Sequence, residues 1–406
     1  MVVLRRYCVT VIRPGQVIAL CVLALLTIGV VMVNSAGMAV NADPARAGVT
    51  AQGLLLSKST VYMGLAMVGL AAGAFFPLRG LAEGMVANHT RRPAPLGWMF
   101  FLCFVLIGLM ALVYVPGLSR ARNGSHRWIE LPVPGLGDAL SIQPSEFAKL
   151  ALVAMIAWYA ATRATVIHQF WRGLVPALMA VGLVAGFIVI EDLGTGILVA
   201  SASCIVLIAG GARLWQFLMF VPVAGAGLVA AVIANPYRLK RLTAFMDPYA
   251  DAEKSGYHMI QSMAAVVNGQ GFGRGLGHGL QKMGYLPEDQ TDFLFAIVCE
   301  ELGIAGAAIV IALFVIMIWA GLRVVRREPV LILKLLGLGI LCIVGLQALI
   351  NLAVVTGLGP TKGIALPLVS SGGTGWTLTA FALGLLVSID RAHHEDEYMP
   401  ARSVAA

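Results

Sequence analysis

The stretch QKMGYLPEDQTDFLFAIVCEELGIAG, from Gln281 to Gly306, joins the longest polar segment of the chain to an apolar run of membrane length. Asp292 lies at this junction, one residue before the sequence turns apolar at Phe293. A carboxylate at a boundary between water and lipid is partly desolvated and can still reach a substrate head group, as a general base near neutral pH must. The same position suits a helix N-cap or a first-turn acid that faces a helix dipole, and the local pattern alone favours that second role.

The composition excludes a water-soluble globular protein, because hydrophobic residues make up 59% of the 406 residues and charged residues only 12%. A membrane-spanning helix needs about 20 predominantly apolar residues. The predicted fold class is therefore an all-α integral membrane protein. Its membrane domain covers residues 16–390, between an N-terminal tail (1–15) and a C-terminal tail (391–406). Ten apolar runs are predicted to span the membrane: 16–36, 59–78, 96–116, 145–162, 173–190, 194–212, 214–234, 293–320, 330–354 and 374–390.

The distribution of basic residues predicts the orientation of these spans. With both termini in the cytoplasm, the cytoplasmic segments carry 15 Lys and Arg residues, and the outer segments carry 6 once residues 235–292 are set aside. Long translocated segments obey the positive-inside rule poorly. Residues 235–292 are therefore predicted to form a large extracytoplasmic loop between spans 7 and 8. The net charge of +8 reflects this topology, and no nucleic-acid partner is predicted.

Neither the cysteines nor the first apolar run suggests a zinc-binding or secreted protein. The six cysteines have no CxxC spacing and mostly fall within apolar runs, which is typical of membrane-embedded side chains. The first run continues past signal-peptide length without a clear small-residue cleavage site. It is therefore expected to remain as the first span.

An acid and a base near the start of the fourth span form a second candidate position. In SIQPSEFAKL, Pro144 and Ser145 indicate a helix start, so Glu146 and Lys149 lie three apart on one helical face inside the membrane. A charge near the bilayer centre costs on the order of 3 kcal/mol, so such residues pair with each other or line a watery cavity. Two roles follow for this pair: a structural ion pair that holds the fourth span, or contact with an anionic head group.

Three other acidic residues lie near or inside the spans. Asp192, in IEDLGTG, lies between the fifth and sixth runs, and helix capping is favoured there over contact with substrate or a cation. Glu300 and Glu301 lie about 12 Å deeper than Asp292 at helical rise. Adjacent acids cannot share a helical face, so at least one needs a partner within the bundle. Both are predicted to be structural.

The outer loop 235–292 combines glycines with basic side chains. GQGFGRGLGHG (Gly269 to Gly279) has no preceding strand and no surrounding α/β unit, so it is not a Rossmann fingerprint. Its glycines allow close packing on the helix bundle or, alternatively, supply N–H groups that cradle a phosphate. The basic residues of the loop suit either a pyrophosphate-bearing ligand or a solvated face: Arg238, Lys240, Arg241, Arg274 and Lys282.

The segment between the last two spans is predicted to be broken or re-entrant. TGLGPTKG (Thr356 to Gly363) and ALPLVSSGGTG (Ala365 to Gly375) interrupt apolar sequence with glycine and proline. Irregular backbone at membrane depth is tolerated where it is buried in protein or lines a cavity. We therefore expect this segment to line a cavity.

Several separate stretches resemble one family, in the same order along the chain. They lie between residues 120 and 390 and read NGSHRWI, QPSEFAKL, DLGTG, FMDP, GYHMIQS, GFGRGLGHGLQKMGYLPEDQTDF, EELG, NLAVVTG and PTKGIALPLVSSGGT. The chain resembles the SEDS family, the FtsW, RodA and SpoVE proteins of bacterial cell-wall synthesis. QKMGYLPE and PTKG resemble the division-type FtsW branch more than the elongation-type RodA branch.

This resemblance implies a peptidoglycan glycosyltransferase in the bacterial cytoplasmic (inner) membrane. Such an enzyme polymerises lipid II, the undecaprenyl-pyrophosphate-linked disaccharide pentapeptide, at the outer face of the membrane. It acts with a class B penicillin-binding protein transpeptidase and with division or elongation complex proteins. The family's catalytic Asp maps onto Asp292, and the Glu and Lys of its QPSE motif map onto Glu146 and Lys149. With the resemblance, catalysis becomes the favoured role of Asp292.

The implied reaction inverts the configuration at the anomeric carbon of the donor sugar. Asp292 would take the proton from the 4-hydroxyl of the acceptor GlcNAc as that oxygen attacks the donor anomeric carbon, and polyprenyl pyrophosphate would leave. Cationic groups, or a divalent cation (Mg²⁺ or Mn²⁺), would stabilise the departing charge, and no metal ligands are assigned. The candidate substrate-binding residues are Glu146, Lys149, Asp192, Arg238, Arg241, Gln261, Lys282, Lys362 and Ser370.

The chain departs from the family pattern around the expected cavity. Glu191 stands where the family usually has Pro, and His258 stands where it usually has Gln. Ser371, Thr374 and Gly375 stand where the family usually has SYGGSS. These changes leave the three matched motif residues in place, so they bear on substrate detail and efficiency.

Two other functions stay open on the sequence. The polytopic bundle with embedded charges also suits a flippase or transporter of a lipid-linked saccharide. A third alternative is a non-catalytic scaffold that activates its penicillin-binding partner. Exchange of Asp292 for Asn separates them, because a transporter would lose lipid movement across vesicles and a scaffold would be little affected.

Overall fold

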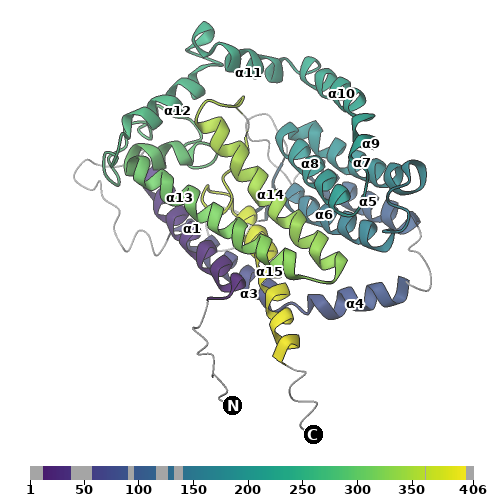
Figure 1. Ribbon diagram of the computed structural model, residues 1–406. Coiled ribbons are helices and arrows are strands. Elements are labelled where there is room, and N and C mark those ends of the chain that lie inside the picture. The colour runs from purple at the N-terminus through teal and green to yellow at the C-terminus, as the bar shows by residue number, and fades with distance from the viewer. Residues whose placement is uncertain are drawn as a thin grey trace, which may run out of the picture.

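Helices make up almost all of the computed structural model (Figure 1), which describes residues 12–37, 57–89, 96–115, 127–131, 140–361 and 363–398. Seven helical stretches within these residues are long and apolar enough to cross a membrane, which confirms the predicted all-α membrane fold. They are α1 (Pro14–Gly37), α3 (Lys58–Phe75), α5 (Leu96–Ala111) with η2 (Leu112–Tyr114), η3 (Phe170–Leu174) with α7 (Val175–Glu191), α9 (Leu214–Leu218) with α10 (Val221–Ile233), α13 (Leu294–Arg327) and α14 (Leu331–Val355).

The other three predicted spans are also helices. They are α6 (Pro144–Thr162), α8 (Leu193–Ala209) and α15 (Thr374–Tyr398). α8 has only 17 residues, α6 carries an acid and a base in its first two turns, and α15 continues into the charged sequence after residue 390. Each of the ten apolar runs therefore coincides with a helix, and a count of ten membrane crossings stays a prediction.

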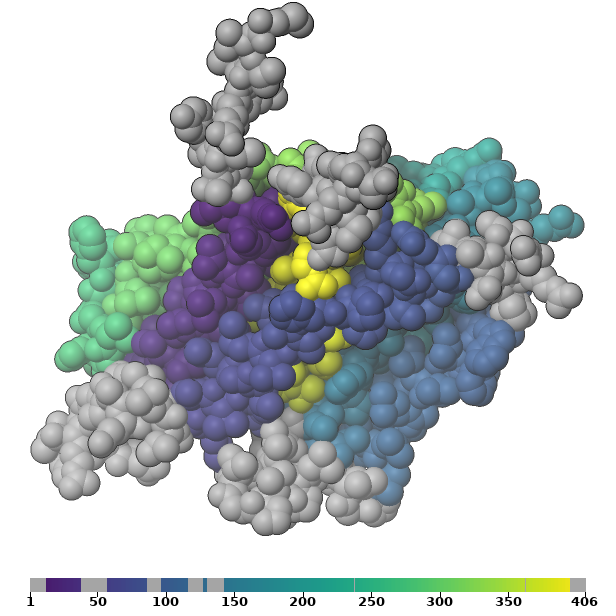
Figure 2. All heavy atoms as spheres, turned by 90° about the horizontal axis from the view of Figure 1, so that it is seen from below, coloured from purple at the N-terminus to yellow at the C-terminus, as the bar shows by residue number. Residues whose placement is uncertain are grey.

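Two groups of helices form the bundle. α1, α3, α13, α14 and α15 share one buried apolar cluster, and α5, α6, α7 and α8 share a second. α3 and α15 approach so closely that a Cβ on Gly73 or Gly384 would clash with the facing backbone, which is the small-residue packing typical of membrane helices. Seen from the end at which α1 starts, the yellow surface of α15 lies between the purple surface of α1 and the blue surface of α3 and α4 (Leu78–His89) (Figure 2).

The predicted outer loop 235–292 contains helices that the sequence analysis did not anticipate. α11 (Pro236–Met246), η4 (Pro248–Asp251) and α12 (Tyr257–Asn268) form an arch from α10 back to α13 (Figure 1). No residue of α10 is buried, so this apolar helix is left to contact lipid. Two short strands, β1 (Ile129–Leu131) and β2 (Leu140–Ile142), pair antiparallel just before α6, with Ile129 opposite Ile142.

α13 is broken at Gly303, where the backbone has φ 64° and ψ −162°. The glycine-rich part of the outer loop packs against this break. Ile304 N donates to Gln270 O at 3.0 Å, and Arg274 N donates to Glu300 O at 3.0 Å. A Cβ on Gly303 would lie 2.6 Å from Gly271 O. The prediction that the alternating glycines pack closely on the bundle is therefore confirmed.

The irregular backbone predicted between the last two spans is also observed. Residues 356–373 contain no helix where the structure describes them. Leu366, Leu368 and Val369 are almost fully buried, and a Cβ on Gly29 of α1 would lie 2.7 Å from Val369 O. This segment therefore lies inside the protein, where its free backbone groups are shielded from lipid.

Candidate active site

Asp292 lies just before α13. It is close to Arg127, to Gly363 of the irregular segment and to Asn351 of α14. A Cβ placed on Gly363 would be 3.1 Å from Asp292 Oδ2 and 3.7 Å from Arg127 Nη1, so both side chains border this glycine. Asn351 on α14, which is 1% exposed, donates from Nδ2 to the carbonyl oxygens of Asp292 (2.8 Å) and Ile364 (2.8 Å). Asn351 therefore fixes the backbone of Asp292 against the irregular segment.

The structure does not support the helix-capping alternative for Asp292. α13 begins at Leu294, and its N-cap residue is Phe293. Within the described part of the chain, the Asp292 carboxylate accepts no hydrogen bond from the first turn of this helix. Capping therefore does not account for the position of this carboxylate.

The surroundings of Asp292 raise its pKa toward neutral pH. Burial raises the pKa of Asp292 to about 7, and the nearby carboxylates of Glu288 and Asp192 add to this rise. The guanidinium groups of Arg241 and Arg127 lower the pKa and partly offset it. A carboxyl group with a pKa near 7 is well matched to general-base catalysis at neutral pH.

Arg127 connects Asp292 to the turn between α7 and α8. Its Nη1 lies 3.2 Å from Asp192 Oδ2, and its Nη2 donates to Glu191 O at 2.8 Å. Asp192 also caps α8, because its side chain accepts from Thr195 N at 3.1 Å and from Thr195 Oγ1 at 2.9 Å. The capping role predicted for Asp192 is confirmed, and the same carboxylate orients Arg127.

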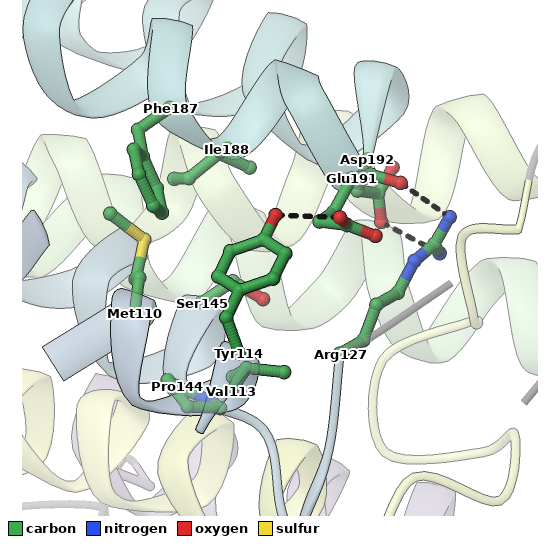
Figure 3. Close-up of a pocket in the computed structure, with 10 residues that line it drawn as sticks. All are labelled: Met110, Val113, Tyr114, Arg127, Pro144, Ser145, Phe187, Ile188, Glu191 and Asp192. Atoms are coloured by element: carbon green, nitrogen blue, oxygen red, sulfur yellow. Dashed lines mark hydrogen bonds and ion pairs between the residues drawn. The ribbon is translucent and has the colours of Figure 1, made fainter. Parts of the chain in front are cut away.

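A small hollow, with a cavity volume of about 40 Å³, opens beside Arg127 (Figure 3). Tyr114 Oη donates to Glu191 Oε1 at 2.6 Å at the rim, so the departure from the family pattern at Glu191 supplies a rim carboxylate. The apolar part of the lining is formed by Met110, Val113, Pro144, Phe187 and Ile188, and the polar part by Tyr114, Arg127, Ser145, Glu191 and Asp192. An apolar wall that ends at a charged group fits an amphipathic ligand.

Glu146 and Lys149 form a partly buried ion pair on α6. Lys149 Nζ lies 2.8 Å from Glu146 Oε2 and donates to Gln347 Oε1 at 2.9 Å. Gln347 Nε2 in turn donates to Ala365 O at 2.9 Å. The pair therefore ties α6 to α14 and to the irregular segment, two residues beyond the glycine that borders Asp292.

The two arginines proposed from α11 lie in different surroundings. Arg241 donates from Nη1 to Thr361 O at 3.2 Å and lowers the pKa of Asp292, so it belongs to the charged cluster around that residue. Arg238 donates to Ala231 O at 3.2 Å and, from Nη2, to Val189 O at 2.7 Å and Ile190 O at 2.9 Å. Arg238 therefore tethers the outer arch to the end of α7.

Two predicted substrate-binding residues are instead buried in structural contacts. Lys282 is 2% exposed, and its Nζ lies 2.7 Å from Glu301 Oε1, so its charge is already neutralised inside the protein. Ser370 is 1% exposed, and its Oγ accepts from Leu366 N at 3.1 Å, which closes a turn of the irregular segment. Both side chains are therefore shielded from solvent by other residues of the protein.

Gln261 and Lys362 are the remaining two candidates. Gln261 lies partly buried on α12, and within the described residues no hydrogen bond joins its side chain to Asp292 or the arginines. Lys362 lies outside the described residues. Among the residues that the structure places, no three His, Cys, Asp or Glu side chains are grouped so as to hold a metal ion.

Comparison with known proteins identifies the family. The family model of the FtsW, RodA and SpoVE cell cycle proteins matches residues 16–395, and the chain belongs to this family. Stage V sporulation protein E of Bacillus subtilis (strain 168) is 37% identical over 382 residues, which cover 93% of this chain and 97% of that protein. The probable peptidoglycan glycosyltransferase FtsW of Halomonas elongata is 40% identical over 294 residues, covering 71% and 72% of the two chains.

Solved structures share the fold. A chain from the structure titled "Structural coordination of polymerization and crosslinking by a peptidoglycan synthase complex" has a TM-score of 0.70 and 26% identity, covering 93% of this chain and 98% of that chain. Rod shape determining protein RodA of Thermus thermophilus has a TM-score of 0.58 and 23% identity, covering 93% and 96%. The bundle described above is therefore the RodA-like membrane fold.

Proposed function

We propose that this protein is a peptidoglycan glycosyltransferase that polymerises lipid II into glycan strands. The observation that carries the proposal is a single carboxylate, Asp292, whose pKa is raised to about 7 beside two arginines, one of which, Arg127, lines a partly apolar hollow. Membership of the family supports the activity, since several relatives are named as probable peptidoglycan glycosyltransferases.

The site supplies the groups that an inverting transfer needs. Asp292 takes the proton from the 4-hydroxyl of the acceptor GlcNAc while that oxygen forms a bond to the donor anomeric carbon. The bond from this carbon to the polyprenyl pyrophosphate breaks, and its electron pair leaves with the phosphate oxygen. The proton held by Asp292 then passes to solvent. Arg127 and Arg241 lie near this carboxylate, and their positive charges would stabilise the negative charge that develops on the leaving group.

The hollow beside Arg127 suits the lipid-linked nature of the substrate. Phe187, Ile188 and Met110 give it an apolar wall that can cover part of a polyprenyl chain. Its rim carries Arg127, whose guanidinium group also borders Gly363, the glycine beside the Asp292 carboxylate. We therefore place the junction between lipid and pyrophosphate at this rim.

We further propose that the reaction occurs at the outer face of the bacterial cytoplasmic (inner) membrane, with both termini in the cytoplasm. Gly15 N, at the start of α1, donates to Asp390 Oδ2 on α15 at 3.0 Å, so these two helix regions lie at the same end of the bundle. α11 and α12 lie at the opposite end (Figure 1). Together with the excess of basic residues in the short loops, this arrangement supports an external Asp292.

A class B penicillin-binding protein transpeptidase is the proposed partner, within a division or elongation complex. One structural relative is part of a peptidoglycan synthase complex that is described as coordinating polymerisation and crosslinking. A transpeptidase beside the polymerase would crosslink each new glycan strand as it forms. This partnership also makes an activating scaffold the main alternative to catalysis.

The decisive experiment supplies lipid II to the purified protein together with its transpeptidase partner. Asp292→Asn is expected to abolish glycan polymer, and Asp289→Asn, a neighbouring acid on the same turn, to retain it. Equal polymer from the wild type and Asp292→Asn would contradict the proposal and favour a scaffold. Loss of lipid II movement across vesicles in Asp292→Asn, with no glycan polymer formed by the wild-type complex, would indicate a flippase.

A further inference from the structure

A buried ionic cluster lies beneath the outer loop, apart from the charged residues around Asp292. The Lys282 cluster consists of Lys282, Glu301, Glu300 and Ser35, and each of these residues is at most 2% exposed. Lys282 Nζ lies 2.7 Å from Glu301 Oε1 and donates to Ser35 Oγ (3.0 Å) and Ser35 O (3.2 Å). Ser35 Oγ in turn donates to Glu301 Oε2 at 2.8 Å. The cluster therefore joins α1, α13 and the loop.

Backbone N–H groups of the glycine-rich segment complete the cluster. Glu301 accepts from Gly277 N at 3.0 Å and from Gly279 N at 3.3 Å. Glu300 accepts from Leu280 N at 3.0 Å and from Gln281 N at 3.1 Å. The N–H groups considered above as a phosphate cradle are thus occupied by carboxylates of the protein itself. The prediction that both glutamates are structural is confirmed.

The charge balance makes Lys282 the critical member. Two carboxylates share one ammonium group, one hydroxyl group and four backbone N–H groups, all shielded from solvent. Removing one partner of a buried ion pair leaves an uncompensated charge, which is far more costly than removing both partners. Loss of the ammonium would therefore drive Glu301 to find water or another donor, and the loop would move with it.

A short, anchored segment connects this cluster to Asp292. Leu286, which is 2% exposed, donates from its N to Gln281 O at 2.8 Å and closes a turn directly beside Lys282. Gln290 O accepts from Ser371 N at 2.9 Å. Asp292 follows Lys282 by only ten positions, so a displacement at one end of this segment reaches the other.

We propose that Lys282 and Glu301 are positioning residues of the glycosyl transfer, which hold the segment bearing Asp292 against α1 and α13. Asn351 fixes Asp292 from the inner side, and the Lys282 cluster fixes the start of the same segment. Catalytic groups that shift by about 1 Å can lose about 100-fold in rate. The kinetic part of this inference rests on the proposed function, and the structural part does not.

The test compares three variants of the full-length protein in complex with its partner. Lys282→Met is expected to lower kcat for lipid II polymerisation by about 100-fold and to change KM by less than about threefold, since substrate contacts are left in place. The double variant Lys282→Met/Glu301→Gln removes both charges and is expected to recover kcat to within about tenfold of wild type. Arg79→Met, which breaks the more exposed Arg79–Glu83 pair of α4 (3.2 Å), serves as the control with unchanged kcat.

Amide hydrogen exchange of the apo protein supplies a readout that does not depend on activity. Lys282→Met should speed exchange in residues 283–293 and leave α6 and α14 protected, and the double variant should restore protection. Unchanged exchange in that segment, or faster exchange with normal kcat, would overturn the inference. Faster exchange across the whole bundle that the double variant does not reverse would also overturn it, because general unfolding explains that result. Full polymer from Asp292→Asn would instead contradict the proposed function while these exchange results stand.

Discussion

The proposed chemistry of this protein depends on one carboxyl group, Asp292, whose pKa lies near neutral pH. Desolvation alone would favour the neutral form of Asp292, and Glu288 and Asp192 act in the same direction. Arg127 and Arg241 restore part of the charged form. The group can therefore accept a proton from a sugar hydroxyl and release it again, which a carboxylate at its ordinary pKa does less effectively.

The pH dependence of polymerisation should report this shift. Because the base must be ionised, the rate is expected to fall about tenfold for each pH unit below about 7, the pKa of Asp292. kcat/KM measured between pH 5 and pH 9 checks this expectation. Burial also raises the pKa of Asp289, to about 6, so Asp289→Asn is the control that should keep the acid limb in place. An acid limb near the ordinary pKa of Asp would contradict the assignment.

Arg127 should matter through its geometry as well as its charge. It spans Asp192, the Glu191 carbonyl and the glycine beside Asp292, and a lysine cannot reproduce these divergent contacts. Arg127→Lys is expected to lower kcat by roughly 10- to 100-fold. Arg238→Gln is the matched comparison, because among the described residues Arg238 donates to carbonyl oxygens near the helix ends, and its loss should reduce thermal stability with a smaller effect on kcat. Equal kinetic losses in the two variants would argue against a site role for Arg127.

At the scale of elements, the break in α13 is the feature on which the outer loop depends. The helix cannot continue through Gly303, and the carbonyl and N–H groups freed on either side are taken up by residues 270–275 of the loop. Glu300 and Glu301, just before the break, accept hydrogen bonds from backbone N–H groups of loop residues 277–281. One glycine therefore allows a membrane helix and the loop that precedes it to share a single hydrogen-bonded junction.

Gly303→Ala tests this junction. The backbone at this position has φ 64° and ψ −162°, a region that is essentially restricted to glycine, and a Cβ would meet Gly273 N and Gly271 O. The variant is expected to lose roughly 2 to 4 kcal/mol of stability, seen as a clearly lower melting temperature in detergent. Gly108→Ala on α5, where a Cβ meets no other atom, should leave the melting temperature unchanged or slightly higher. Similar behaviour of the two variants would show that the break is not required.

At the scale of the whole molecule, the sequence predicts the helices far better than the contacts between them. All ten apolar runs coincide with helices, because the length and composition of a span follow directly from the bilayer. The helices of the outer arch were missed, since a polar, glycine-rich segment carries no comparable signal. Asp192 was correctly assigned to a cap, because that role is local.

The long-range contacts were beyond this kind of inference. Lys282 was predicted to face a ligand because it lies in a basic loop, but its partners, Ser35 and Glu301, come from helices distant in the sequence. Arg127 was passed over as one basic residue among several, although the Arg-Trp pair in NGSHRWI marks it as part of a shared motif. Only the folded arrangement shows that one cation is buried and the other borders the candidate site.

The orientation of the whole molecule gives the last prediction. If residues 235–292 are external, Glu253→Cys, at an exposed position just before α12, should react with a membrane-impermeant maleimide in intact cells. Glu83→Cys, exposed on α4 near the start of α1 and the end of α15, should react only after permeabilisation. Wild-type protein measures the background from the native cysteines, of which Cys21, Cys103 and Cys299 are buried. Labelling of Glu83→Cys alone in intact cells would place Asp292 on the cytoplasmic side, where an enzyme that builds an external polymer could not use it.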